Sequence, residues 1–433
     1  MLNNTNKKSI MKKYFIIAAA AVVAMASCAK DEILFDETAP SNKIGFEVAN
    51  YARQTKANAS LTNSEDGIYS FHTYAYQFPK IGDPRVFMSE TIYAWQEATQ
   101  ENKLTSGEAP VAVWAPETDY YWPKTGYINF YSYAGTHTPT QATAAAAADQ
   151  DMTTISLTFE NAVIDATSNI LVADAALHQG RTNYQDNAYE VDDDGNGDDV
   201  TKGVPTLFRH QLAKIIVDVE ARTTDEKKSK NTIWKVQVLS ANGTGNDEIK
   251  SEIIPINKGS LALTNTDDAT AAGTKVWTKT NESSTNISGW VPSSTSTDKE
   301  NISLSNSDVL TIAANTTGDG TQSVILAARS VMPQLTSNVG FTLVYKVQAL
   351  HGTTVYLEEI RTVGIDAAAA IGDLASTVTS WQANKKITYH IIIDPVSEKV
   401  TFDPAVEAYD EIDADGDVDD ININEGGIVV PQP

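Results

Sequence analysis

The stretch Lys43-Ile44-Gly45-Phe46-Glu47-Val48-Ala49 carries a large apolar side chain at every second position. A period of two is typical of a β-strand with one buried face, because successive side chains of a strand point to opposite faces of the sheet. Ile44, Phe46 and Val48 are therefore expected to point into a core. The same alternation returns many times along the 433-residue chain.

Further strand-like runs follow, and turn residues such as Gly82-Asp83-Pro84 separate them. The expected strands cover residues 44–49, 68–78, 86–95, 111–114, 127–133, 154–159, 170–173, 212–219, 232–239, 323–328, 340–350, 354–363, 387–393 and 399–402. The stretch 264–308 is dominated by Ser, Thr, Asn and Asp. We expect it to be too polar to bury, and to form a long excursion with one or two short strands.

No segment has the pattern of a helix longer than a few turns, so the predicted class is all-β, most simply two β-sandwiches in series. Residues 192–199 read Asp-Asp-Asp-Gly-Asn-Gly-Asp-Asp and have no apolar periodicity. This composition predicts a loop near a domain boundary. We expect an N-terminal sandwich over 43–200, a C-terminal sandwich over 201–409 and an acidic tail over 410–433.

The single cysteine, Cys28, ends the sequence Met-Ala-Ser-Cys, and a basic pair and the apolar run 14–24 precede it. This run is too short to span a bilayer and has the length of the apolar part of a signal peptide. We therefore predict a lipoprotein signal over 1–28, with lipid attachment at Cys28, and a polar tether over 29–42. The alternative, an ordinary signal peptide in which Cys28 is incidental, is less favoured because small residues stand just before the cysteine.

The sequence holds 32 basic and 56 acidic residues, for a net charge of −24. Such a chain repels phosphate backbones, so nucleic acid is excluded as a partner. After the predicted cleavage Cys28 is the only thiol, which leaves no disulfide. The six histidines form no H-E-x-x-H pair and none stands beside a G-x-S-x-G elbow. We therefore expect no enzyme activity, and His210 is expected to be a packed core residue.

Calcium is the only ion for which the sequence offers candidate ligands. Asp192, Asp194 and Asn196 are followed by a glycine and match the first half of an EF-hand-type loop. Gly203 stands where such a loop needs its bidentate Glu, so the second half fails. A solvated acidic loop is the favoured interpretation, and no other cofactor is expected.

Tyrosine and tryptophan are abundant enough to form sugar-stacking platforms, with 17 Tyr and 7 Trp. In residues 120–133, however, the aromatic side chains alternate through an expected strand. Packing within the core explains such alternation more often than contact with a ligand.

Several short segments, in this order behind the predicted lipidation site, resemble the fimbrillin family. These are the Mfa-like and FimA-like lipoprotein pilins (type V pili) of Gram-negative bacterial surfaces. Each segment is weak alone, but the five places are spread over most of the mature chain. The matching segments are Lys43-Ile44-Gly45-Phe46-Glu47-Val48, Tyr121-Trp122-Pro123 with Phe130-Tyr131-Ser132-Tyr133, Asn169-Ile170-Leu171-Val172-Ala173, Phe208-Arg209-His210-Gln211-Leu212-Ala213-Lys214, and Val331-Met332-Pro333-Gln334 with Trp381 and Ile387-Thr388-Tyr389-His390.

The resemblance implies two transthyretin-like β-sandwich domains and a subunit of adhesive fimbriae. It also implies that the precursor is an outer membrane lipoprotein. An arginine-directed protease would cut it after the first strand, which would release the acylated N-terminal fragment. Here Ile44, Phe46 and Val48 would be the inward residues of the released strand. Arg53 is the candidate cleavage site and Lys56 is the alternative. A strand from a neighbouring subunit would then fill the open groove by β-augmentation.

The resemblance places the donor strand in the C-terminal extension. Its candidate residues are Ile421, Ile423, Ile428, Val429 and Val430. The alternative is a disordered acidic tail. The acidic stretch 413–420 and the arginine-poor cleavage region depart from the family pattern, so a stalk, an anchor and a tip subunit all stay open.

The leading hypothesis is thus a structural pilin at the cell surface, whose partners are other pilin subunits. The chief alternative is a monomeric outer-membrane glycan-binding lipoprotein. That alternative requires exposed coplanar aromatic rings on one face and no proteolysis at Arg53. An enzyme comes third.

Overall fold

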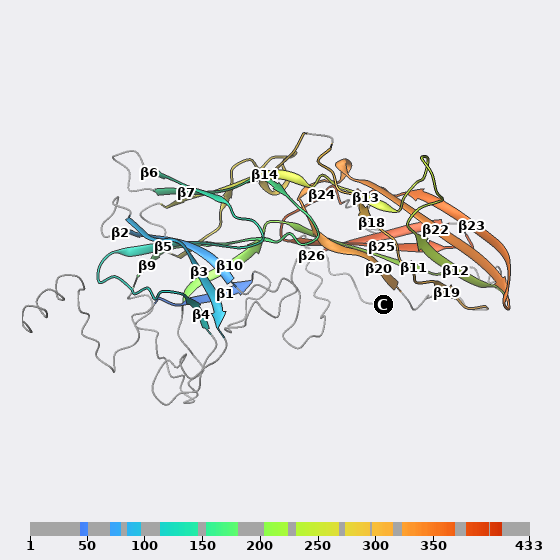
Figure 1. The fold of residues 1–433 in the computed structure, drawn as a ribbon, viewed down its shortest axis with the longest axis horizontal. Coiled ribbons are helices and arrows are strands. Elements are labelled where there is room, and N and C mark those ends of the chain that lie inside the picture. The colour runs from blue at the N-terminus through green and yellow to red at the C-terminus, as the bar shows by residue number, and fades with distance from the viewer. Residues whose placement is uncertain are drawn as a thin grey trace, which may run out of the picture. The chain divides into compact units, whose positions relative to one another are not determined.

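The computed structural model describes residues 44–50, 70–78, 85–96, 113–145, 153–180, 203–223, 231–267, 273–294, 297–314, 323–368, 378–397 and 399–408. Regular structure within these residues is strand, apart from two 3₁₀ helices of three residues each, η2 (Ile287–Gly289) and η3 (Thr336–Asn338). The predicted all-β class is confirmed (Figure 1). In this part of the chain, no helix has the length and apolar character needed to cross a membrane.

The first sandwich consists of a nine-stranded and a five-stranded sheet. The nine-stranded sheet contains, in order, β1 (Phe46–Asn50), β10 (Val204–His210), β8 (Ile170–Ala173), β5 (Tyr127–Gly135), β2 (Ser70–Phe78), β3 (Arg85–Gln96) and β4 (Val113–Pro116), with β9 (Ala175–Gln179) beside β5 and β15 (Gly273–Lys275) beside β9. The five-stranded sheet contains β16 (Thr278–Lys279), β14 (Lys258–Asp267), β7 (Thr153–Val163) and β6 (Thr140–Ala145), with β17 (Trp290–Pro292) beside β14.

One apolar cluster joins the two sheets of this sandwich. Tyr131 and Val172 contribute from the nine-stranded sheet, and Leu157, Phe159 and Leu261 contribute from β7 and β14. All five side chains are buried. The nine-stranded sheet therefore has one face against the second sheet, while its other face carries a separate aromatic cluster.

The second sandwich consists of a four-stranded and a six-stranded sheet. The four-stranded sheet contains β20 (Ser323–Val331), β11 (Ala213–Ala221), β25 (Lys385–Asp394) and β26 (Lys399–Ala408). The six-stranded sheet contains β18 (Ile302–Ser303), β13 (Glu252–Ile254), β22 (Gly340–His351), β12 (Ile233–Leu239) and β19 (Leu310–Ile312), with β23 (Thr354–Gly364) beside β22. A two-stranded ladder joins β21 (Gln334–Leu335) and β24 (Ser380–Trp381).

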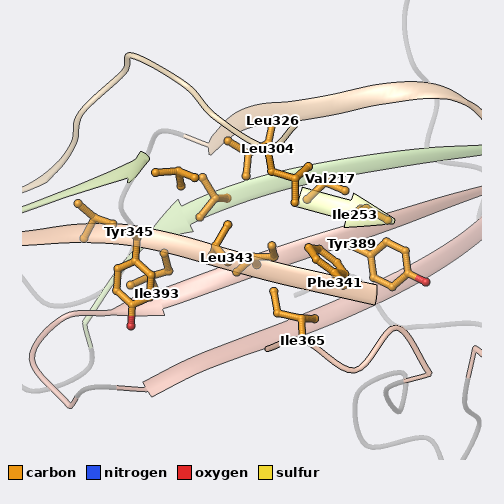
Figure 2. Close-up of a cluster of buried hydrophobic side chains, with 14 of the residues drawn as sticks. Val217, Ile253, Leu304, Leu326, Phe341, Leu343, Tyr345, Ile365, Tyr389 and Ile393 are labelled. Atoms are coloured by element: carbon orange, nitrogen blue, oxygen red, sulfur yellow. The ribbon is translucent and has the colours of Figure 1, made fainter. Parts of the chain in front are cut away.

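The core of the second sandwich follows the predicted period of two. Every second residue of β11 is buried, from Ala213 to Ala221, and so is every second residue of β12. Figure 2 shows side chains of both sheets in one cluster, with Val217 and Tyr389 from the four-stranded sheet near Phe341 and Leu343 from the six-stranded sheet.

Strand pairing joins segments on both sides of residue 200. β10 pairs with β1 and β8, and β14 pairs with β7. Residues 258–292 thus add strands to the first sandwich, although the predicted boundary at 200 assigns them to the second. A single strand's pattern does not encode its partner, because the pairing is set by contacts far apart in sequence.

The prediction for the polar stretch 264–308 is wrong in two respects. Four short strands lie within it, β15 to β18, where one or two were expected. Trp277 and Trp290 are buried, and their indole N–H groups donate to the Ala173 and Gln211 carbonyls, at 2.8 and 2.7 Å. The polar composition of this stretch gave no indication that the two tryptophans are buried, since each supplies a large apolar surface within a run of small polar residues.

Candidate functional site at the first strand

β1 is an end strand of the nine-stranded sheet. Within the described residues it pairs with β10 alone, and the two strands run parallel. Two backbone bonds hold the residues just before it: the Val204 N–H donates to the Gly45 carbonyl and the Ile44 N–H donates to the Tyr120 carbonyl, both at 2.8 Å. Tyr120 follows β4, the strand at the opposite end of the sheet. One backbone bond therefore links the residues before β1 to the residues after β4.

The inward side chains of this segment are buried as the alternation predicts. Ile44, Phe46 and Val48 all belong to the aromatic cluster on the second face of the nine-stranded sheet, whereas Gly45 between them is exposed. Burying a side chain of this size contributes about 1.5–3 kcal/mol. The three residues together fix β1 in place although it has a ladder on only one side.

Phe46 fills the centre of that aromatic cluster. Its ring centroid lies 4.4 Å from that of Tyr93, 5.3 Å from that of Phe71 and 5.5 Å from that of Phe130. These rings come from β3, β2 and β5, none of which is a neighbour of β1 in the sheet order. The sheet therefore curves until its first strand packs across its own face.

Tyr93, whose ring packs against that of Phe46, also carries a polar group. The ring is buried, and the hydroxyl has no hydrogen-bond partner within the described part of the chain. Burial raises the pKa of this hydroxyl far above its ordinary value, because the phenolate would be desolvated. The apolar cluster that Phe46 joins thus includes one side chain whose hydroxyl is unpaired among the described residues.

The partner strand β10 is anchored independently of β1. Arg209 of β10 forms a bidentate ion pair with the buried Asp174, with Nε–Oδ1 at 2.7 Å and Nη2–Oδ2 at 2.8 Å. The Asp174 N–H also donates to the Leu207 carbonyl at 2.9 Å. Bidentate pairs of this kind combine strength with fixed geometry. These contacts of β10 do not involve β1.

Removal of β1 would change the first sandwich in two ways. The edge of β10 would lose its ladder, and the aromatic groove of Phe71, Tyr93 and Phe130 would lose the side chain that fills it. An open strand edge beside an apolar groove is the surface that accepts a strand from another chain by β-augmentation.

The structure brings together only some of the predicted site residues. Ile44, Phe46 and Val48 form one buried row, and β1 ends at Asn50, just before the candidate cleavage residue Arg53. The remaining predicted sites lie outside the described residues. These are Cys28, Arg53, Lys56, the possible calcium ligands Asp192, Asp194 and Asn196, and the donor candidates Ile421, Ile423, Ile428, Val429 and Val430.

Sequence reasoning missed the groove residues and a cluster on the other face of the same sheet. Glu90 adopts φ +56° at an irregular point of the β2–β3 ladder, and the Tyr133 hydroxyl donates to its Oε1 at 2.6 Å. The His72 ring stacks on Tyr133 at 4.8 Å. Burial is the largest cause and Glu90 the second of the raised pKa of Tyr133. The same two causes raise the pKa of Tyr74 to about 12. No sequence pattern marks this bulge.

This second cluster is packed and does not offer an open platform. Tyr133 is almost fully buried and its hydroxyl is already bonded to Glu90. Among the residues whose side-chain exposure the structure describes, the large exposed aromatic side chains are Tyr121 and Tyr356, which lie in different sandwiches. The expectation that the aromatics of residues 120–133 pack in the core is confirmed for Trp122, Phe130 and Tyr133, which are buried.

His210 is buried at the end of β10, as expected of a packed histidine. In the segments that the structure describes, no group of three or more His, Asp and Glu side chains is placed to hold a metal ion. The possible calcium loop is not among those segments, so it stays a prediction.

No protein-family model matches the chain, and no curated protein matches it. Solved structures to which it is similar include a fimbrial protein from Bacteroides vulgatus, at 14% identity and a TM-score of 0.43, covering 85% of this chain and 99% of that one. Another is a candidate cell adhesion protein from Bacteroides uniformis, at 12% identity and a TM-score of 0.36, covering 85% and 98%. A third is a candidate polysaccharide binding protein from Bacteroides thetaiotaomicron, at 11% identity and a TM-score of 0.27, covering 85% and 98%. Likeness at this level does not define a function.

Proposed function

We propose that the chain is a structural subunit of a bacterial surface fibre, which assembles when β1 is exchanged for a strand of a neighbouring subunit, and which supports adhesion. The position of Phe46 carries this proposal. It belongs to an end strand with a single ladder, yet it fills the centre of an aromatic core. The resemblance to the fimbrillin family gives the same strand the role of the departing segment. The role is structural and involves no catalysis.

The proposed route begins with a lipoprotein attached to the outer membrane through Cys28. Cleavage at Arg53, or at Lys56, leaves β1 wholly on the released fragment, because β1 ends at Asn50. The mature subunit then starts at Gln54 or at Ala57 and presents an open groove. Its partners are further copies of this chain or related subunits.

The proposed donor is the C-terminal tail of the next subunit. The segment Asp420-Ile421-Asn422-Ile423-Asn424 alternates polar and apolar residues, as a strand with one buried face does. Ile421 and Ile423 would take the places of Phe46 and Val48 in the groove. A strand held in this way gains both a backbone ladder and apolar burial.

The alternative is a monomeric glycan-binding lipoprotein. It is less supported, because such a site needs several exposed aromatic rings on one face, and the aromatic clusters of the described residues are packed. The two functions differ in whether loss of β1 leads to polymers.

An arginine-specific protease applied to the full-length precursor tests the proposed function. Intact-mass spectrometry is expected to give a product that starts at Gln54, and SDS electrophoresis without heating is expected to show a ladder of oligomers. The matched control is Arg53→Lys, which keeps the charge but removes the cleavage site, and which should give neither the product nor the ladder.

Two results distinguish the alternatives. A product that starts at Ala57 after cleavage by a lysine-directed protease, together with a ladder, would move the site to Lys56 and retain strand exchange. Loss of β1 without any oligomer would refute strand-exchange assembly, and the monomeric lipoprotein would become the better account.

A further inference from the structure

β23 is an exposed edge strand of the second sandwich (Figure 1). Within the described residues it pairs with β22 alone. One face is partly covered, since Leu357 and Val363 pack against the core, but Ile360 on the opposite face is 51% exposed. The far side of β23 thus presents a row of backbone N–H and C=O groups next to an exposed apolar side chain. Edges of this kind are templates for another strand.

The ladder between β22 and β23 is regular over the C-terminal part of β23. The β22–β23 register has one irregularity, between Ala349 and Leu350, and it runs evenly from Leu357 to Gly364. A straight, regular segment keeps its side chains in strict alternation, so an added strand would meet a flat and defined edge.

The sequence of β23 is complementary to itself about Ile360. It reads Leu357-Glu358-Glu359-Ile360-Arg361-Thr362-Val363. We propose that two copies of this chain pair antiparallel through β23, with Ile360 of each copy at a two-fold axis normal to the sheet. Glu359 of one copy then lies opposite Arg361 of the other, twice by symmetry. Leu357 lies opposite Val363, also twice.

The two-fold axis restricts the possible registers. A rotation about the sheet normal keeps each face on its own side, so a residue can oppose only residues of the same parity. Centring the pair on 358 or 359 sets a glutamate against itself, and centring it on 361 sets Arg361 against itself. Centring on 357 brings Glu359 opposite Val355, at the irregular end of the ladder. Among these registers, only the one about Ile360 pairs opposite charges.

The two faces of the paired edge gain different contacts. On the face that carries Glu359 and Arg361, an ion pair already links the two side chains within one strand, at 2.8 Å between Nη2 and Oε2. The second copy would extend this pair into a four-membered charge row, with an apolar pair at each end. On the opposite face, the exposed Ile360 side chain would meet its own copy. Each cross-strand pair is of the kind that stabilises antiparallel sheets.

Charged side chains on an edge strand commonly serve to prevent pairing. In that role their signs need no particular order. Here the acidic and the basic residue stand at equal distances on either side of Ile360, which is what self-pairing requires. The contact lies in the second sandwich and does not depend on removal of β1.

Sedimentation velocity on the uncleaved full chain tests the pairing, since the uncleaved chain still holds β1. The wild type is expected to show a concentration-dependent monomer–dimer equilibrium. Glu359→Arg and Arg361→Glu each set like charges against each other and are expected to be monomeric when studied alone. The matched control, Glu117→Arg, makes the same charge change at an exposed position of the first sandwich and should dimerise as the wild type does.

Mixing the two single variants gives the decisive result. The arginine introduced at position 359 of one variant then faces the glutamate introduced at position 361 of the other. The mixture is therefore expected to dimerise although neither variant does alone, and the double variant E359R/R361E should also regain dimerisation. Recovery cannot come from misfolded chains, so a folding defect would be distinguished. A monomeric wild type, or a dimeric wild type whose variants do not complement each other on mixing, would overturn the proposal.

Discussion

Phe46 and Tyr93 pack against each other in the first sandwich, with their ring centroids 4.4 Å apart and their planes tilted by 56°, although their strands stand at distant positions in the sheet order. This contact joins β1 to the core that it covers. It explains how a strand with one ladder stays in place in the uncleaved chain. It also defines what another strand would have to replace.

Phe46→Ala should destabilise the uncleaved chain strongly. The substitution removes a buried ring from the centre of an aromatic cluster, which costs about 3–5 kcal/mol in comparable cores. Urea denaturation followed by tryptophan fluorescence measures the loss. Val86→Ala is the control, because Val86 is 65% exposed and its truncation should change the free energy of unfolding little. Equal effects of the two substitutions would contradict the described packing of β1.

Tyr93→Phe should leave stability unchanged or raise it by up to about 1 kcal/mol. The hydroxyl is buried with no hydrogen-bond partner among the described residues, so its removal deletes an unpaired polar group. Tyr133→Phe is the matched comparison. It removes a hydroxyl that donates to Glu90 at 2.6 Å, and it should lower the free energy of unfolding by about 1 kcal/mol. Thermal unfolding of both variants would show a loss for Tyr133→Phe alone, and equal losses would argue against these assignments.

The ion pairs of His390 predict a stability that falls as the pH rises. Nδ1 lies 2.8 Å from Asp218 Oδ1 and Nε2 lies 3.1 Å from Glu220 Oε2. The bond to Asp218, then its charge and the bond to Glu220, raise the pKa of His390 above its ordinary value. This stabilisation is fully present below the unfolded-state pKa of about 6.5 and is lost as the pH rises through the folded-state value.

His390→Gln should therefore cost more stability at about pH 6 than at about pH 8.5. Chemical denaturation of the variant and the wild type at both pH values measures this difference. In the background D218N/E220Q the pH dependence of the substitution should shrink. A cost that is the same at both pH values would refute the charged state of His390.

Gly135→Ala should destabilise the first sandwich by at least about 2 kcal/mol. Gly135 has φ +111°, and an added Cβ would lie 2.1 Å from the Asn169 carbonyl oxygen. Gly245→Ala isolates the cost of the backbone angle, because Gly245 has φ +136° and open space around it. The difference between the two variants in thermal unfolding reports the steric contact. Similar costs would show that the β5–β8 corner yields more easily than this geometry implies.

Alternating sequence predicted several of the strands whose inward residues are apolar, although it missed β14, in which Leu261 and Leu263 are buried. Phe46 and Val48 in β1 and the buried row of β11 follow that pattern. β10 was missed because two of its four inward residues, Thr206 and His210, are polar although buried. A period in hydrophobicity cannot show a strand whose core-facing positions are filled by polar groups.

The candidate site was only partly predictable for a related reason. The alternation identified Phe46 as inward, but nothing near it in sequence indicates Tyr93, Phe71 or Phe130, which come from three other strands. The curvature that brings them together arises from pairing between segments far apart in the chain, as between β1 and β10. Such contacts are set by the whole sheet and not by any local pattern.

Competition by a β1 peptide tests the central claim most directly. A synthetic peptide of residues 43–50 is added while the precursor is cleaved at Arg53, and the oligomer ladder is followed by SDS electrophoresis without heating. The peptide is expected to refill the groove and stop the ladder, whereas the same peptide with Phe46→Asp is expected to have no effect. A ladder that forms equally well with both peptides would contradict assembly through the groove of β1.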